Sequence, residues 1–102
     1  ISNSGETAEV IALTSMAKSW QNKVIAITEN SHSSLAKNAD VVINIACDRE
    51  ADPLNLAPTT STTLTMAAGD ALAAALMVHR GFTVENFGQF HPGGTLGQVT
   101  NK

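Results

Sequence analysis

The chain has 102 residues, enough for at most one domain, and its 43% apolar content is sufficient for a packed core and argues against disorder. Its formal net charge is -3 and its six Lys and Arg residues are scattered. This excludes the basic patch of a nucleic-acid-binding protein and the polybasic segment of a protein held on an anionic membrane surface.

Only 15% of the residues are charged, so we expect part of the surface to be buried against another subunit or against further chain. Cys47 is the single cysteine and no signal peptide is visible, which fits a reducing, cytoplasmic location. Because Cys47 has no second Cys and no His at metal-ligand spacing, we expect no zinc site. The chain starts at Ile1 in the middle of a motif, so we expect it to be the C-terminal part of a longer protein.

The first residues place hydroxyl groups around a glycine, directly in front of a helical apolar pattern. The hydroxyls belong to Ser2, Ser4 and Thr7, and the glycine is Gly5. The first backbone N–H groups of a helix lack partners within the helix and carry the positive end of its dipole, so they can bind an anion. The loop predicts a phosphate site, but the same residues also fit a Ser4 that only caps the helix.

The first half of the chain has the pattern of an α/β protein. Apolar residues recur at helical spacing from Glu6 to about Asn22. Two short runs of branched apolar residues, 24–28 and 41–46, predict strands buried on both faces, with a short helix over about 33–38 between them. Strand, helix, strand is a parallel crossover, so we expect a parallel sheet flanked by helices.

The second half is dominated by one long apolar helix. A charged loop over 47–59 precedes it, and long loops in compact domains tend to be functional. The helix is predicted over Thr60–Arg80 and is apolar all round except at Gly69 and Asp70, so we expect it to be buried, with Asp70 bonded to a partner. Its alanines favour close packing across a subunit interface. Its apolar run, Leu64 to Val78, is too short, and broken by Asp70, to favour a membrane span. Further helical turns are predicted over 83–90.

Hydroxyl groups gather again at the start of this long helix, over Thr59–Thr63. In a parallel sheet the loops that follow strands lie at the same edge, so this run and the first loop can converge on one phosphate or sugar. Two ordinary helix caps are the alternative reading. The presence of both clusters favours the ligand site.

Three titratable residues are candidates for acid–base chemistry. His91 precedes a Pro-Gly-Gly turn, and histidine is suited to proton transfer near neutral pH. Glu50 lies in the charged loop, and Glu9 lies one turn into the first helix. The plain alternatives are a surface histidine, a solvated loop charge and a carboxylate that stabilises the helix dipole. The residues alone leave these alternatives open.

Five short stretches of the sequence resemble a known enzyme family. ISNSGET (1–7) is similar to the sugar-phosphate-binding loop of SIS (sugar isomerase) domains. The other four stretches resemble the D-arabinose-5-phosphate isomerase branch of that family, and they are LNLAPTTSTT (54–63), GDALA (69–73), Gly81-Phe82 and HPGGTLG (91–97). The resemblance covers nearly the whole chain.

The resemblance implies an α/β fold, a three-layer parallel sheet flanked by helices of the flavodoxin-like doubly wound type, incomplete at its N-terminus. Residues 1–102 would be the C-terminal part of a single SIS domain. It also implies interconversion of D-arabinose 5-phosphate and D-ribulose 5-phosphate by acid–base enediol chemistry, with no metal or other cofactor. The alternative is a non-catalytic, sugar-phosphate-binding SIS regulatory module, and a purely structural dimerisation domain ranks last.

The resemblance further implies which partners and residues are used. The partners would be a phosphorylated sugar and further copies of the chain, in a homodimer or homotetramer through the Thr60–Arg80 helix, with no nucleic acid and no membrane. Glu50 and His91 would form the acid–base pair, with Glu9 as supporting or alternate base, and such a base needs a raised pKa. Contacts to the sugar phosphate would fall on Ser2, Asn3, Ser4, Thr7, Thr59, Thr60, Ser61 and Thr62.

One residue departs from the pattern of close family members. Asp52 stands where they usually carry a cysteine, two residues after the proposed active carboxylate of Glu50. This departure leaves the sugar specificity open.

Overall fold

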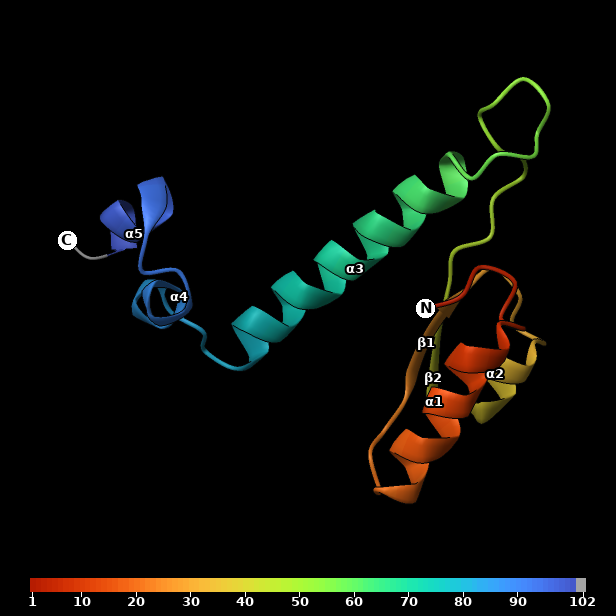
Figure 1. The fold of residues 1–102 in the computed structure, drawn as a ribbon, viewed down its shortest axis with the longest axis horizontal. Coiled ribbons are helices and arrows are strands. Elements are labelled where there is room, and N and C mark those ends of the chain that lie inside the picture. Colours follow the sequence, from red (N-terminus) through yellow and green to blue (C-terminus); the bar gives the residue numbers. More distant parts are fainter. Residues whose placement is uncertain (101–102) are drawn as a thin grey trace. The chain divides into compact units, whose positions relative to one another are not determined.

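The computed structural model describes residues 1–100, which fall into two compact units, Ile1–Gly69 and the residues from Asp70 onward. The first unit contains α1 (Ala8–Ser19), β1 (Ile25–Thr28), α2 (Ser34–Asn38), β2 (Val41–Asn44) and the beginning of α3 (Thr60–His79) (Figure 1). The second contains the end of α3, followed by α4 (Val84–Phe90) and α5 (Gly94–Thr100).

The predicted parallel crossover is confirmed. β1 and β2 pair in parallel, with Ile25 opposite Val41 at the start of the ladder. The connecting helix α2 begins directly after Ser33, whose hydroxyl accepts the Ala36 N–H at 3.2 Å and so caps the helix. The fold of the first unit is therefore α/β, as the sequence predicts.

The loop before α1 runs along the edge of β1 that faces away from β2. The Ser2 N–H donates to the Ile27 carbonyl at 3.2 Å, and the Glu29 N–H donates to the Asn3 carbonyl at 3.0 Å. Successive carbonyls of a strand point to opposite edges, so β1 can bond to this loop and to β2 at once. This pairing places the hydroxyl-rich loop at the carboxyl end of β1.

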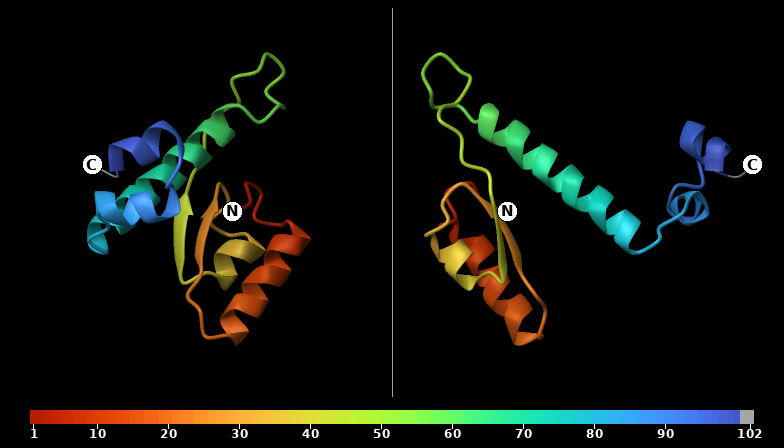
Figure 2. Two further views of the ribbon diagram at one scale, coloured as in Figure 1. Left: turned by 60° about the vertical axis from the view of Figure 1, so that its left-hand side comes forward. Right: turned by 180° about the vertical axis from the view of Figure 1, so that it is seen from behind.

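Helices α1 and α2 pack together on one face of the sheet, with α2 against β1 (Figure 2). The buried apolar residues come from β1, α2 and the residue that follows β2, and they are Ala26, Ile27, Leu35, Ala36 and Ile45. This small core holds the first unit together.

The predicted burial of both strands on both faces is confirmed for most of β1 and is wrong for β2. Ala26, Ile27 and Thr28 are buried, whereas Val41 is 53% exposed and Val42 is 37% exposed. α2 packs against β1 rather than β2, so the side chains of Val41 and Val42, which point to opposite faces, are both left uncovered.

The predicted long helix is confirmed as α3, and its burial, predicted to involve a subunit interface, stays a prediction because one chain shows only its own contacts. Within Thr60–His79, all of which the structure describes, Ser61 is the one buried residue. Met66 is 70% exposed and Val78 is 84% exposed. Asp70, predicted to be buried, is exposed as well. An apolar pattern of this kind indicates that a helix packs against a partner.

The length of α3 also bears on whether it could span a membrane. The helix has 20 residues and a mean hydropathy of 1.3 in its most apolar window, so by length and composition it could cross a membrane. The prediction against a span concerned the shorter apolar run from Leu64 to Val78, so the length of the whole helix does not overturn it. Asp70 still interrupts this run near its middle.

The second unit is helical. The predicted turns over 83–90 are confirmed as α4, which begins with reciprocal bonds between Thr83 and Asn86, a capping box. α5 was not predicted, because its sequence starts with glycine, a poor helix former. It packs on α4, and the two helices line an apolar groove of about 310 Å³ together with Met77 and Phe82.

Candidate functional site

The loop from Ser2 to Thr7 is braced by its own hydroxyl groups. The Ser2 and Thr7 hydroxyls lie 2.8 Å apart, and the Ser2 hydroxyl also accepts the Gly5 N–H at 3.1 Å. The Ser4 hydroxyl is exposed and accepts the Glu6 N–H at 3.2 Å. A hydroxyl that accepts can still donate, so Ser4 retains its proton for a ligand. Ser2 and Thr7 thus shape the loop, and Ser4 faces solvent.

The loop is fixed to the start of α2. Gly5 has φ +70°, and a Cβ at this position would overlap the Ser33 hydroxyl. Its carbonyl accepts the Leu35 N–H at 3.0 Å. The Glu6 carboxylate accepts the Ser34 N–H at 2.8 Å, and this backbone hydrogen bond lowers the pKa of Glu6. The turn therefore needs glycine at position 5 for conformation and for space.

Ser4 does not cap α1. The N-cap residue is Thr7, and within the described residues no side chain caps this helix. The N–H groups of Asn3, Ser4 and Thr7 likewise donate no hydrogen bond to any group of residues 1–100. Together with the first N–H groups of α1 and the helix dipole, they form the kind of donor set that binds a phosphate.

The Glu50 carboxylate lies at the start of α3. Its Oε2 accepts the Thr59 N–H at 2.8 Å and the Ser61 N–H at 3.1 Å, and it lies 3.2 Å from the Thr59 hydroxyl. Hydrogen bonding by the Ser61 side chain, followed by the Thr59 N–H, lowers the pKa of Glu50 from 4.5 to about 2. This direction is opposite to the raised pKa expected of a base, because the donors stabilise the ionised carboxylate.

The hydroxyl run at the start of α3 is largely occupied by local bonds. The Thr59 hydroxyl accepts the Ala51 N–H at 2.8 Å, and the Thr62 hydroxyl donates to the Thr59 carbonyl at 2.8 Å. Ser61 is 3% exposed. The structure thus brings Glu50 together with this run. Among residues 1–100 no hydrogen bond joins the run to the Ser2–Thr7 loop, so their convergence on one ligand stays a prediction.

His91 belongs to the second unit, where it follows the last residue of α4. Its ring is exposed and stacks on Phe87, with ring centroids 4.3 Å apart and 9° between the planes. A Cβ on Gly97 would overlap the Pro92 carbonyl, so a glycine there lets α5 lie against the His91-Pro92 turn. The third candidate, Glu9, is exposed in the first turn of α1.

Two residues that the sequence did not mark as site residues bond to the backbone of the 47–59 loop. Asp52 and Asn55 accept backbone N–H groups of their own loop, and Asn55 does so from Glu50. Asp and Asn side chains bond to nearby backbone groups in turns, which was the available signal. Within residues 1–100, no group of three His, Cys, Asp or Glu side chains is placed to hold a metal ion.

Comparisons with known proteins show the family to which the chain is similar. Residues 1–75 match the family model described as "SIS domain". Arabinose 5-phosphate isomerase KpsF of Escherichia coli is 54% identical over 98 residues, which cover 96% of this chain and 31% of the relative. Arabinose 5-phosphate isomerase KdsD of Pseudomonas aeruginosa is 51% identical, covering 96% and 30%. The chain thus spans about three tenths of the length of these curated relatives.

Solved structures show the same fold. A protein of Escherichia coli CFT073, solved in complex with arabinose 5-phosphate, aligns with a TM-score of 0.75 at 44% identity, covering 88% of this chain and 48% of that one. A putative sugar-phosphate isomerase of Listeria monocytogenes aligns with a TM-score of 0.77 at 35% identity, covering 89% and 48%. The resemblance read from the five sequence stretches is confirmed, and with a family-model match over residues 1–75 this chain belongs to the SIS domain family.

Proposed function

We propose that the protein containing this chain is an isomerase that interconverts D-arabinose 5-phosphate and D-ribulose 5-phosphate. The observation that carries the proposal is the uncapped start of α1, where free N–H groups lie beside the exposed Ser4 hydroxyl. This arrangement suits a phosphate. The names of relatives at 51–54% identity, and the arabinose 5-phosphate in the complex of the Escherichia coli protein, support the choice of sugar.

The Ser2–Thr7 loop is the proposed phosphate site. Asn3 and Ser4 supply N–H groups, Ser4 adds its hydroxyl, and the Ser2–Thr7 pair keeps the loop in shape. The hydroxyl run Thr59, Thr60, Ser61 and Thr62 is proposed to contact the hydroxyl groups of the sugar. Binding of the phosphate, far from the reacting carbons, provides free energy for orienting them.

The reaction needs proton transfer at two neighbouring carbons. The open-chain sugar loses a proton from the carbon beside its carbonyl, an enediol forms, and a proton returns to the other carbon. We assign Glu50 and His91 as the acid–base pair, with Glu9 as supporting or alternate base. With a pKa of about 2, Glu50 is ionised at neutral pH and can accept a proton, but the Thr59 and Ser61 donors on its Oε2 make it a weaker base than a free carboxylate.

The finer fold and the assembly are proposals as well. We place residues 1–102 in the C-terminal part of a single SIS domain with a three-layer, doubly wound sheet. Copies are proposed to associate as a homodimer or homotetramer through α3, whose exposed side chains include Met66 and Val78. A membrane partner is disfavoured because Asp70 at a bilayer centre would cost about 2.5–3.5 kcal/mol. A cytoplasmic protein that uses no cofactor and binds no nucleic acid fits these features.

The deciding experiment is turnover by the full-length protein. With D-ribulose 5-phosphate in D₂O, we expect D-arabinose 5-phosphate that carries deuterium at the carbon beside the carbonyl. Glu50→Gln and His91→Ala should lower kcat strongly. Sugar-phosphate binding with neither turnover nor deuterium exchange would instead identify the non-catalytic regulatory module.

A further inference from the structure

We propose that Asp52 and Asn55 are positioning residues that hold Glu50 at the start of α3. The proposal rests on the catalytic role proposed for Glu50. Neither residue needs to touch the sugar, because both act through the backbone of the 50–59 loop.

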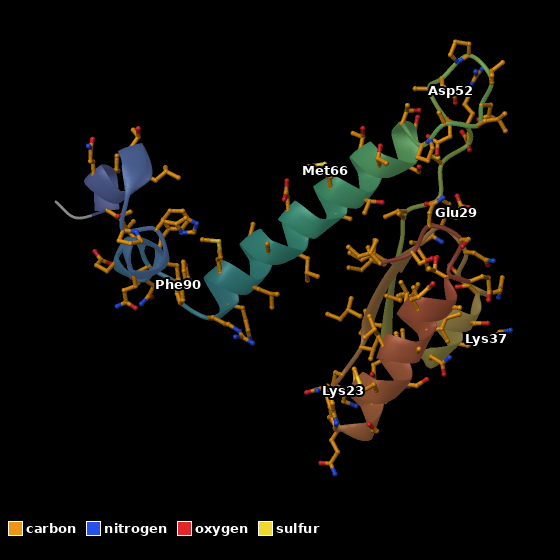
Figure 3. All side chains as sticks on the ribbon, in the orientation of Figure 1. Lys23, Glu29, Lys37, Asp52, Met66 and Phe90 are labelled. Atoms are coloured by element: carbon orange, nitrogen blue, oxygen red, sulfur yellow. The ribbon has the colours of Figure 1, made fainter. Side chains whose placement is uncertain are left out.

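The Asp52 carboxylate is the centre of the loop. Its oxygens accept N–H groups at 2.8–2.9 Å, those of Leu54, Leu56 and Ala57. Figure 3 shows Asp52 within this loop. Charge-assisted hydrogen bonds of this length are the strong ones. The carboxylate thus gathers the backbone of residues 54–57 around itself.

Apolar packing does not fix the shape of this loop. Leu54 is 75% exposed and Leu56 is 77% exposed, although each has a large side chain that a core would bury. Because apolar packing contributes little to the stability of this loop, the hydrogen bonds to Asp52 determine the path of the backbone here.

Asn55 connects the middle of the loop to the backbone of Glu50. Its backbone is left-handed, with φ 56°, and its N–H donates to the Asp52 carbonyl at 3.0 Å. Its Oδ1 accepts the Glu50 N–H at 2.6 Å. Asn tolerates the left-handed region better than most residues, and its amide oxygen supplies the acceptor. The backbone of Glu50 is therefore held from the middle of the loop.

The loop closes at the start of α3. The Thr59 hydroxyl accepts the Ala51 N–H at 2.8 Å, and the Thr59 N–H donates to the Glu50 carboxylate at 2.8 Å. Chain segments 50–51 and 59–61 are thus joined through side chain and backbone. A closed, hydrogen-bonded loop places the Glu50 carboxylate in one position, and a displacement of about 1 Å can cost 100-fold in rate.

Substitutions at Asn55 separate positioning from general stability. Asn55→Gly permits φ 56° but removes the oxygen that accepts the Glu50 N–H. Asn55→Asp keeps an acceptor oxygen and tolerates the same φ. In the full-length protein we expect Asn55→Gly to lower kcat about 10- to 100-fold with KM changed less than about threefold, and Asn55→Asp to restore most of kcat. Leu54→Ala, which leaves all backbone donors in place, is the matched control and should keep wild-type kcat.

A second readout does not depend on turnover. The carboxyl of Glu50 is titrated by ¹³C NMR in wild type, Asn55→Gly and Asp52→Ala. We expect its midpoint to move up from about 2 toward 4.5 in both variants as the Thr59 and Ser61 donors are lost. If Asp52→Ala does not fold, Asn55→Gly carries the test. If both kcat and the Glu50 midpoint are unchanged in Asn55→Gly, the proposal is wrong.

The two proposals fail in different ways. If the wild type turns over neither pentose phosphate, the proposed reaction is wrong, yet an upward shift of the Glu50 midpoint still supports positioning. If the wild type is active and Asn55→Gly equals it in both measurements, the reaction stands and the positioning role is overturned.

Discussion

Gly5 faces the Ser33 hydroxyl so closely that a Cβ on Gly5 would occupy the same space. The contact joins the loop proposed to bind phosphate to the cap of α2, since the Ser33 hydroxyl also accepts the Ala36 N–H. The loop and the helix are thus held at one spacing, and the N–H groups of Asn3, Ser4 and Thr7 donate to no other group of residues 1–100. The conformation of this loop therefore depends on glycine at position 5.

Gly5→Ala should destabilise the protein and weaken phosphate binding. The new Cβ meets Ser33, and φ +70° is unfavourable for alanine, so we expect a loss of about 1–3 kcal/mol in the free energy of unfolding. Urea unfolding measures it, and titration with D-arabinose 5-phosphate measures binding. Gly93→Ala is the control: a Cβ there meets nothing within 4 Å and Gly93 lies outside α3, so stability should be close to that of wild type. Equal behaviour of the two variants would contradict the role given to Gly5.

The low pKa of Glu50 makes a prediction about acid stability. Its pKa is lowered in the folded chain from 4.5 to about 2, so its ionised form stabilises the folded state. That contribution is complete above about pH 4.5 and is lost as the pH falls toward 2. Glu50→Gln cannot ionise, so its urea midpoint should fall less steeply than that of wild type over this range. Parallel curves would show that Glu50 is not bonded to the start of α3 in solution.

Helix and strand positions were predictable from the sequence because they depend on local patterns. The branched run at 24–28, the helical spacing after Glu6 and the hydroxyl-to-apolar sequence from Thr60 each gave the correct element. α5 was missed because its stability comes from packing on α4 and from Gly97 against Pro92, not from propensity. Contacts between elements leave a weaker trace in sequence than periodicity does.

Burial and charge state were harder to predict. The pattern of α3 shows that Met66 and Val78 are apolar, but not which surface covers them. The sequence places Glu50 in a loop, whereas its low pKa depends on how that loop returns to Thr59 and Ser61. Such side chain-to-backbone bonds depend on the loop conformation, which residue types alone do not specify.

Gly97→Ala should disturb the turn that carries His91. A Cβ on Gly97 would overlap the Pro92 carbonyl, so α5 or the turn must shift. If His91 is part of the acid–base pair, kcat should fall about 10- to 100-fold, since misplacement of a catalytic group is costly. Gly93→Ala is the control, because its Cβ meets nothing within 4 Å and kcat should stay near that of wild type. A wild-type kcat in Gly97→Ala would contradict the role proposed for His91 in proton transfer.

The exposed apolar side chains of α3 predict that oligomers depend on this helix. Met66 is 70% exposed and Val78 is 84% exposed, and large apolar side chains left in solvent are the kind that interfaces cover. Met66→Glu should place an unpaired charge there and shift the full-length protein toward monomers. Light scattering after size-exclusion chromatography measures the mass. Leu54→Glu is the matched control, because Leu54 is 75% exposed but lies in a loop outside α3.

Sedimentation with lipid vesicles, added to the mass measurement, distinguishes a protein partner of α3 from a lipid partner. If α3 packs on another copy, Met66→Glu lowers the mass in buffer without detergent, and wild type stays in the supernatant when vesicles are pelleted. If α3 enters a bilayer, wild type co-sediments with vesicles and Asp70→Leu binds them more strongly, because a charge at the helix centre opposes insertion. An unchanged mass for Met66→Glu, with Leu54→Glu also unchanged, would remove Met66 from the proposed interface.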